Sequence, residues 1–442
     1  MRNILVIGAG RSAVTLIKYL LDNSQKNNWL VTVADFSEEL AKKAVSNNEN
    51  GKAIFFDATS KKQREVEINN ADIVISMLPA SMHITVAKDC VRLKTNLVTA
   101  SYVSEEVSLL DESAKQAGVL LLNEIGLDPG IDHMSAMQVI DNIKEKGGRL
   151  TSFKSFCGGL VHPDYDNNPW NYKFTWNPRN VVLAGQGTAQ YIKQGKYKYI
   201  PYYKLFERTE QMSILDAGEF EGYANRDSLS YRKAYGLEDI PTLFRGTLRR
   251  KGFCKSWNMF VQLGMTDDTY VVKNSENMTY REFTNLFFPF NNELTVEQKF
   301  CNYLSIPKNS EEFQKAEWLG IFSDSEIGII NATPAQVLQK ICEEKWNLDS
   351  QDKDMIVMQH QFEYTLDGKM QKLNSSLLVF GDDPRYTSMA KTVGLPVAIA
   401  TKLILNGDIT LTGVKIPTAK DIYVPVLKEL EENGINFIEE LV

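Results

Sequence analysis

Cysteine and histidine are scarce in this chain. The five cysteines lie far apart and form no C-x-x-C pair, which argues against both a disulfide framework and a zinc cluster. The four histidines are widely spaced and offer no evident ligand set for a catalytic metal. We therefore expect a cytoplasmic protein in a reducing compartment, without a metal site.

An excess of positive charge and long apolar runs are also lacking. The net charge of −7 over 442 residues argues against nucleic-acid and anionic-membrane partners. No apolar run looks long enough to span a bilayer, and the chain enters a predicted strand at once, which leaves no room for a signal peptide. The length is sufficient for two or three domains.

The clearest pattern that is present lies at the N-terminus. The apolar run Ile4–Ile7 leads into the turn Gly8–Ala13, and a helical pattern follows. A second apolar run, Trp29–Val33, precedes Asp35. Strand, glycine turn, helix, strand and terminal acid is the order of a dinucleotide-binding βαβ unit. The alternative interpretation is an ordinary α/β turn beside an empty cleft.

The residue types of this turn suit a pyrophosphate. Gly8 permits a tight turn, Gly10 lets the backbone approach the ligand, and the small Ala13 lets the helix pack closely on the strand. Free N–H groups at the helix start face the phosphates. Asp35 is expected to accept hydrogen bonds from the ribose hydroxyls. The cofactor contacts predicted from this unit are Gly8, Gly10, Arg11, Ser12, Ala13 and Asp35.

The α/β alternation continues after Asp35. Further strands are predicted at residues 53–56, 73–78, 97–100 and 119–122, with helical stretches between them. This predicts a parallel sheet of the Rossmann type, whose carboxyl ends collect the ligand-facing residues. Asp57, Leu78, Ser101 and Tyr102 fall at these ends.

After a helix predicted at 131–146, the alternation of strands and helices gives way to a different pattern. Strands at 153–156, 244–248, 355–364 and 373–380, the last two flanking Asp367-Gly368, predict a mainly antiparallel sheet. Residues 279–344 look helical, and the C-terminal segment returns to α/β character, with Pro396 expected to kink or split an apolar helix at 389–405. We expect an α/β protein with three parts: a Rossmann-type dinucleotide domain (1–130 and 385–442), an α+β substrate-binding and dimerisation domain (131–274 and 351–384) and a helical insertion (275–350).

Several longer motifs, in order along the whole chain, carry a resemblance. They are Ser101–Ser104, Asn123–His133, Cys157–Leu160, Asn168-Pro169, Tyr172–Trp176, Asn225–Leu229 and Phe244–Arg249. Together they resemble the saccharopine dehydrogenase family of the L-glutamate-forming type. The resemblance implies a homodimeric enzyme of lysine metabolism that oxidises saccharopine, with a nicotinamide cofactor, to an imine. Water then opens the imine to L-glutamate and 2-aminoadipate 6-semialdehyde, and the reverse direction is equally open.

Two rival functions remain. A carboxy-polyamine dehydrogenase would perform the same imine chemistry on a less anionic substrate and would not need paired arginines. A catalytically silent NAD-binding regulatory protein would bind the cofactor without turnover. A turnover assay with saccharopine separates the three.

Saccharopine has three carboxylates, so an acidic chain must concentrate cations in its cleft, and arginine binds a carboxylate bidentately. The resemblance places Arg226 and Arg249 at the substrate carboxylates; the alternative for both is a solvated surface arginine. Arg245 and Arg249, four residues apart on a predicted strand, should share one face. The substrate contacts implied are Ser101, Tyr102, Asp128, Arg226, Thr247, Leu248 and Arg249.

A base must take protons from the amine and from the attacking water. The candidates are Tyr102, Asp128 and Cys157, and the sequence does not choose among them. Asp128 has the alternative role of a helix N-cap, Tyr102 of an interface tyrosine and Cys157 of a buried structural thiol. The further cofactor contacts expected are Asp57, Leu78, Asp128, Ile131, Phe174 and Trp176.

The segment after Asp35 bears on the cofactor. Family members that use NADP carry a small or basic residue here, whereas this chain has Phe36 and Ser37, with no basic residue before Lys42. A 2′-phosphate beside Asp35 would meet like charge. The sequence therefore predicts NAD as the cofactor, in preference to NADP.

Overall fold

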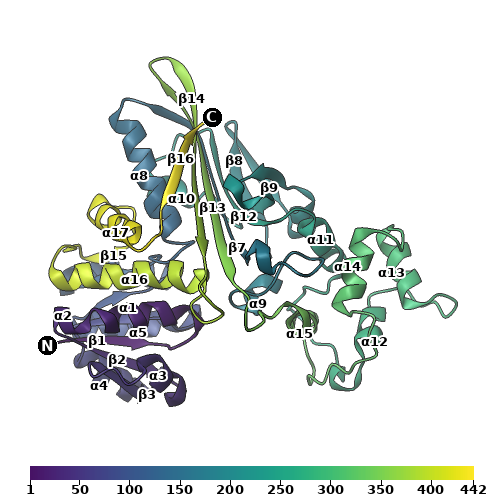
Figure 1. The fold of residues 1–442 in the computed structure, drawn as a ribbon, viewed down its shortest axis with the longest axis horizontal. Coiled ribbons are helices and arrows are strands. Elements are labelled where there is room, and N and C mark those ends of the chain that lie inside the picture. Colours follow the sequence, from purple (N-terminus) through teal and green to yellow (C-terminus); the bar gives the residue numbers. More distant parts are fainter. The chain divides into compact units, whose positions relative to one another are not determined.

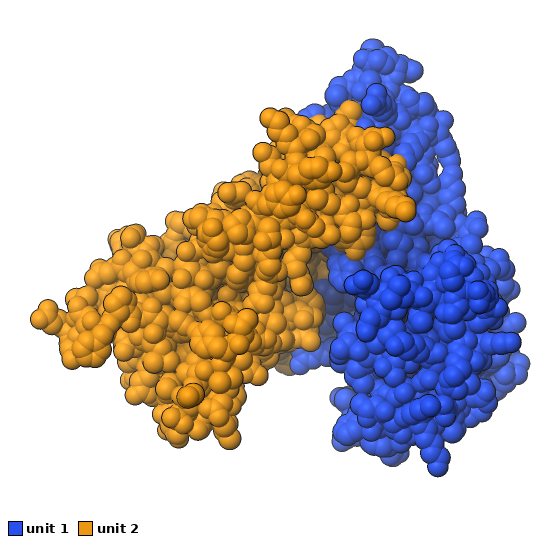
Figure 2. Space-filling view, turned by 180° about the vertical axis from the view of Figure 1, so that it is seen from behind, with its two compact units in different colours: residues 1–150, 364–442 blue, residues 151–363 orange.

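The computed structural model describes residues 1–442, which form two compact units (Figure 2). Unit 1 comprises residues 1–150 and 364–442, and unit 2 comprises residues 151–363. The helical insertion predicted at 275–350 lies within unit 2. Residues 131–150 and 364–384, which the sequence assigned to the substrate domain, belong to unit 1 instead.

Unit 1 is built on a seven-stranded, all-parallel sheet with the strand order β15-β6-β5-β4-β1-β2-β3 (Figure 1). Successive residues such as Leu5 and Val6 are both buried although they point to opposite faces, so helices cover both faces. The strands are β1 (Arg2–Ile7), β2 (Trp29–Asp35), β3 (Gly51–Phe55), β4 (Ile73–Ser76), β5 (Asn96–Val98), β6 (Leu120–Leu122) and β15 (Gly413–Lys415). The order of the first six is that of the Rossmann fold, as predicted.

The helices of unit 1 alternate with these strands and return at the C-terminus. They are α1 (Val14–Asp22), α2 (Ser24–Asn27), α3 (Glu38–Val45), α4 (Lys61–Asn69), α5 (His83–Leu93), α6 (Glu105–Ser108), α7 (Asp111–Ala117), α8 (Ile131–Glu145), α16 (Ser388–Asn406) and α17 (Lys420–Glu432). Helix α8 joins unit 1 because it packs against α17, where the Tyr423 hydroxyl donates to Asp141 Oδ2 at 2.6 Å.

Helix α16 lies along α1 (Figure 1). The two helices approach so closely that a Cβ on Gly394 would lie 2.8 Å from Leu16 N, which explains a glycine within a helix. Pro396 does not split the helix, which runs unbroken over 19 residues. By length and composition α16 could cross a membrane, contrary to the prediction that no apolar run is long enough. Most of it is buried inside the nucleotide domain, and this burial accounts for its apolar sequence.

Unit 2 contains five strands in the order β10-β11-β12-β7-β13, with the hairpin β8–β9 beside β12. Most pairs are antiparallel, but β7 and β12 are parallel, so the sheet is mixed. The strands are β7 (Arg149–Val161), β8 (Ala189–Lys193), β9 (Lys196–Ile200), β10 (Glu210–Ser213), β11 (Glu219–Ala224), β12 (Thr242–Arg250) and β13 (Asp354–Leu366). The sequence predicted β7, β12 and β13 but missed β8 to β11.

Three helices of unit 2 begin with a capping box, a threonine followed three residues later by Glu or Gln, and this pattern can be read directly from the sequence. The helices are α9 (Pro178–Val182), α10 (Tyr231–Ala234), α11 (Phe253–Leu263), α12 (Tyr280–Asn285), α13 (Val296–Leu304), α14 (Glu311–Leu319) and α15 (Pro334–Trp346). In unit 1 the turn Asp367-Gly368 has positive φ at both residues and leads into β14 (Lys369–Phe380), which pairs with β16 (Phe437–Leu441).

Candidate functional site

The glycine turn of unit 1 has the predicted conformation. Gly8 follows β1 with φ of +103°, and a Cβ there would lie 2.9 Å from Met77 O. Its N–H donates to Ala34 O at 2.8 Å. By contrast, a Cβ on Gly10 would meet no atom within 4 Å. The backbone is therefore packed on one side of the turn and open at Gly10, where a phosphate needs to approach.

A short 3₁₀ helix, residues 11–13, continues from Gly10 into α1. Arg11 is exposed, Ser12 is half-buried and Ala13 is buried, as its expected packing on the strand requires. The first turn thus offers one solvent-accessible guanidinium close to the glycine turn.

A cleft of about 430 Å³ opens at the carboxyl ends of β1 to β4. This volume falls within the range of roughly 300–1,000 Å³ that is common for small-molecule sites. Four residues that the sequence predicted at the cofactor, Gly8, Asp35, Asp57 and Leu78, line this cleft together with Phe36 and Thr59. We take this cleft as the candidate nucleotide site.

The side chain of Asp35 faces the glycine turn. Its Oδ2 accepts from Ala9 N at 2.7 Å and its Oδ1 accepts from Ser37 N at 2.8 Å. Both carboxylate oxygens are thus engaged by backbone amides, which also offset the negative charge. Asp35 therefore holds the turn in shape. Each oxygen keeps a second lone pair, so the predicted contact with the ribose hydroxyls stays a prediction.

Asp57 behaves similarly at the end of β3. Its Oδ1 accepts from the hydroxyl of Thr59 at 2.7 Å and from Thr59 N at 2.9 Å. These hydrogen bonds hold the pKa of Asp57 below its ordinary value, so it is a carboxylate at neutral pH.

Ser101 and Tyr102 follow β5 at the same edge of the sheet. Ser101 Oγ lies 2.7 Å from Nε2 of His83, a residue that the sequence did not single out. Tyr102 is half-exposed, with 52% of its surface accessible. The next residue, Val103, donates its N–H to Glu124 Oε1 at 3.0 Å, which ties this loop to the segment after β6.

The segment after β6 is a buried charged network. Glu124 Oε2 lies 2.9 Å from His133 Nε2, and Asp132 Oδ1 accepts from Gly130 N at 2.6 Å. All three side chains are almost fully buried. The N-cap of α8 is Gly130, so Asp128 is not the helix cap that served as its alternative role; it lies half-buried before it. Ile131 is fully buried and its side chain packs in the core.

In unit 2 the decisive residue is Arg249 on β12. Its side chain is 2% exposed, and its guanidinium carbon lies 5.1 Å from the ring centre of Tyr172 and 5.8 Å from that of Tyr223. Its only hydrogen bond runs from Nη1 to Leu248 O at 2.9 Å, and Nε has no partner. Glu221 lies opposite on β11, but its Oε1 accepts from the backbone N of Cys254.

Other groups of this pocket suit an anion. The hydroxyl of Tyr172 is also buried without a partner, and burial raises the pKa values of Tyr172 and Tyr223, so both stay neutral donors. Thr247 is paired in register with Cys157 of β7, which is 7% exposed. Arg249 Nε and the Tyr172 hydroxyl are both buried donors without a protein partner, and an anion could accept from both.

The remaining predicted residues of unit 2 are either exposed or buried. Arg226 is exposed, whereas Leu248 is fully buried. Arg245 is buried like Arg249, as the strand spacing predicted, with its guanidinium 4.2 Å from the ring centre of Tyr231. The spacing of Arg245 and Arg249 along β12 predicts that they share a face, but it does not show which residues surround them. Their aromatic neighbours, Tyr231 and Tyr172, come from distant segments.

Phe174 and Trp176 were predicted near the cofactor. Phe174 is 1% exposed and packs edge-on against Trp346, so its ring belongs to the aromatic core of unit 2. Trp176 is half-buried. Sequence reasoning assigned no role to Tyr172 and Tyr223. Tyr223 lies on β11, a strand that was not predicted, so only the structure shows its register opposite Thr247.

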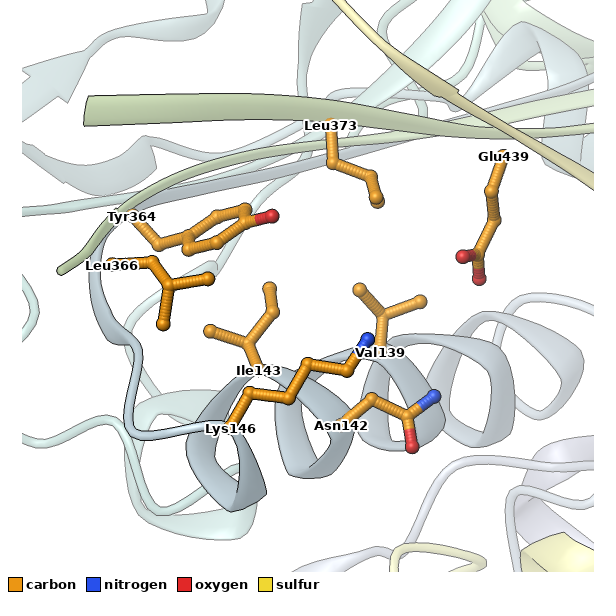
Figure 3. A pocket seen from close by; sticks show the side chains of 8 residues that line it. All are labelled: Val139, Asn142, Ile143, Lys146, Tyr364, Leu366, Leu373 and Glu439. Carbon is orange, nitrogen blue, oxygen red and sulfur yellow. The ribbon is translucent and has the colours of Figure 1, made fainter. Parts of the chain in front are cut away.

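A second hollow in unit 1 lies between α8 and residues of β14, β16 and the last turn-proximal residues of β13, Tyr364 and Leu366, which belong to unit 1 (Figure 3). The figure shows Val139 and Ile143 of α8 facing Leu373 of β14, with the Lys146 side chain reaching toward Val139. Its volume of about 60 Å³ is far too small for a nucleotide or for saccharopine. We therefore exclude it as the functional site.

Two family models match successive parts of this chain. Residues 4–122 match the model described as the saccharopine dehydrogenase NADP binding domain, and residues 126–435 match the saccharopine dehydrogenase C-terminal domain. This chain belongs to the saccharopine dehydrogenase family.

Relatives and a solved structure agree with this membership. A protein of Schizosaccharomyces pombe named saccharopine dehydrogenase [NADP(+), L-glutamate-forming] is 34% identical over 100% of this chain and 99% of its own length. The mitochondrial alpha-aminoadipic semialdehyde synthase of Mus musculus is 33% identical over 99% of this chain, which spans about half of that protein (47%). Apo saccharopine dehydrogenase (L-Glu forming) from Saccharomyces cerevisiae matches with a TM-score of 0.90, at 33% identity and full coverage of both chains.

These findings contradict the prediction that NAD is preferred. The family model for the first domain is described as NADP binding, and the fungal relatives carry NADP(+) in their names. The physical reason for the error is the orientation of Asp35. Its carboxylate accepts hydrogen bonds from the amides of Ala9 and Ser37, which stabilise the negative charge at the turn, so it is not the isolated charge on which the prediction depended.

Proposed function

We propose that this chain is an NADP-linked oxidoreductase that acts on the CH–NH group of saccharopine and yields L-glutamate and 2-aminoadipate 6-semialdehyde, or runs the reverse reaction. The observation that supports this most is Arg249, a buried guanidinium with an unpartnered Nε. The names of the full-length fungal relatives support the same substrate and cofactor.

The substrate assignment follows from charge. Burying a cation without a counter-ion is costly, and an incoming carboxylate relieves that cost while it accepts from Nε and from the Tyr172 hydroxyl. Saccharopine has three carboxylates, so the exposed Arg226 of the same unit is available for another. The hydroxyl of Thr247 is already held by Asn225 Oδ1 at 2.7 Å, which fixes its direction beside Arg249.

The cofactor assignment follows from the cleft of unit 1. NADP would lie with its pyrophosphate at Gly10 and its adenosine among Asp35, Phe36 and Asp57. Bound NADP supplies a hydride acceptor. We assign the 2′-phosphate to Arg11, because it is the exposed cation next to the turn that Asp35 braces.

The chemistry requires proton transfers in both directions at the substrate nitrogen. As the substrate carbon loses a hydride, the amine nitrogen loses a proton to a base and a C=N bond forms. Water then adds across this bond, and one of its protons passes to the nitrogen. The second passes from the new hydroxyl to the nitrogen as the C–N bond breaks to give the aldehyde and the primary amine of glutamate. Tyr102, Asp128 and Cys157 are the candidates for the base.

A first prediction concerns Arg11. Replacement of Arg11 by Ala should raise the KM for NADP about tenfold to a hundredfold and leave that for NAD nearly unchanged, because a charge-assisted hydrogen bond to phosphate contributes about 1.5–3 kcal/mol. Steady-state kinetics with each cofactor at saturating saccharopine measure the two constants.

Lys42→Ala is the matched control, because Lys42 is already paired with Glu38 at 2.7 Å and should not respond to the phosphate. An equal loss for NAD and NADP in Arg11→Ala would contradict the assignment of Arg11 to the 2′-phosphate.

A further inference from the structure

In unit 1, Ser101 is linked through His83 to the buried Ser76 by two successive hydrogen bonds. Ser76, the last residue of β4, places its Oγ 2.9 Å from His83 Nδ1, and His83 Nε2 lies 2.7 Å from Ser101 Oγ. Ser76 is fully buried and His83 is 5% exposed, whereas Ser101 is half-buried. Only Ser101, at one end of this hydrogen-bonded series, is therefore accessible to a ligand.

The imidazole also joins two parts of the sheet edge. Nδ1 holds Ser76, which ends β4 two residues before the cleft residue Leu78, and Nε2 holds Ser101, which follows β5. His83 is the first residue of α5, so its ring is carried by a rigid element. Such an arrangement fixes a hydroxyl more precisely than a loop can.

Burial lowers the pKa of His83 to about 4, so the ring is neutral at neutral pH. A neutral imidazole has one nitrogen that donates and one that accepts. If Nε2 accepts the Ser101 proton, the hydroxyl can only accept from the ligand. If Nε2 donates to the Ser101 oxygen, the hydroxyl proton points away from the ring and can be donated to the ligand. A serine hydroxyl without this bond would rotate freely between donating and accepting.

We propose that His83 is a positioning residue that fixes the direction and the hydrogen-bonding role of the Ser101 hydroxyl toward saccharopine. This inference rests on the proposed function, in which Ser101 contacts the substrate. His83 itself does not touch the substrate and acts through Ser101.

Two substitutions of His83 distinguish the hydrogen bond at Nδ1 from the hydrogen bond at Nε2. His83→Asn keeps a polar atom close to the position of Nδ1 and loses the contact with Ser101, whereas His83→Gln keeps a polar atom near the position of Nε2. We expect His83→Asn to raise the KM for saccharopine about tenfold, Ser101→Ala to do the same and His83→Gln to recover most of the loss. The KM for NADP should change less than twofold in all three.

The double variant His83→Asn/Ser101→Ala provides the decisive measurement. If His83 acts through Ser101, the double variant should be no worse than Ser101→Ala alone in a double-mutant cycle on the saccharopine KM. His162→Asn in unit 2, a partly exposed histidine outside the site, is the matched control and should leave both constants unchanged.

Additive effects of the two substitutions, or a loss in His83→Asn that appears only in the melting temperature or equally in the KM for NADP, would overturn the inference. Wild-type protein that does not turn over saccharopine would instead contradict the proposed function, and with it this role. The two failures are therefore distinguishable.

Discussion

Replacement of Arg249 by Met is expected to lower kcat/KM for saccharopine about a hundredfold or more, because truncating one member of a buried charge pair typically costs on the order of 2–5 kcal/mol. Methionine keeps much of the volume between Tyr172 and Phe253 and removes only the charge. Steady-state kinetics at saturating NADP measure the loss.

The same variant should fold normally. In the free protein Arg249 has one hydrogen bond and no ion pair, so its removal should change the melting temperature little, while saccharopine should no longer raise that temperature. A large loss of stability without ligand would mean that Arg249 is a structural residue.

The adjacent Arg250 is the matched control. Its guanidinium lies over Phe220 and donates to Ala217 O, so it has an internal structural role. Arg250→Met should lower the melting temperature and leave the KM for saccharopine within about twofold. A similar loss of substrate in both variants would contradict the specific role of Arg249.

Replacement of Asp35 by Ala is expected to weaken NAD and NADP alike, by about tenfold or more. The substitution leaves the N–H groups of Ala9 and Ser37 without their acceptor, and a hydrogen bond to a charged group contributes about 1.5–3 kcal/mol. Because the glycine turn loses its brace, both dinucleotides lose the same pyrophosphate site. Dissociation constants from fluorescence titration with each reduced cofactor measure this.

Asp35→Asn supplies the graded comparison, because an amide keeps one acceptor oxygen and should give an intermediate loss. A selective loss of NAD in Asp35→Ala, with NADP unaffected or improved, would show that the carboxylate contacts the ribose after all. The turn-bracing role would then be wrong.

The parts of the fold that the sequence predicts are those with local signals. Gly8 and Gly10 between an apolar strand and a helix predict the nucleotide unit, and its strand order follows from the Rossmann pattern. The turn Asp367-Gly368 has the positive φ values that its residues favour. In each case a few neighbouring residues determine the conformation.

The missed strands have no such signal. In β9, Lys196 and Lys198 alternate with tyrosines and nearly all the side chains are exposed, so no apolar face marks the strand. The assignment of α8 to unit 1 depends on its contact with α17, almost 300 residues away. Contacts at that distance in sequence have no local pattern.

The candidate site shows the same division. The sequence indicated that Arg249 and Asp35 lie at ligand sites, but it could not show which hydrogen-bond partners their side chains have within the protein. Whether Arg249 is unpaired depends on where Glu221 directs its carboxylate, and whether Asp35 is free depends on Ala9 N. The preference for NAD that was predicted from Asp35 is contradicted by the family model and by the names of the fungal relatives. Cytoplasmic location and a homodimer remain predictions.

The central claim is tested most directly by a turnover assay with saccharopine and each oxidised cofactor, followed through the absorbance of the reduced nicotinamide. The account predicts turnover with saccharopine, with a higher kcat/KM for NADP than for NAD and none with a carboxy-polyamine. Turnover with the carboxy-polyamine but not with saccharopine, or cofactor binding without any turnover, would contradict it.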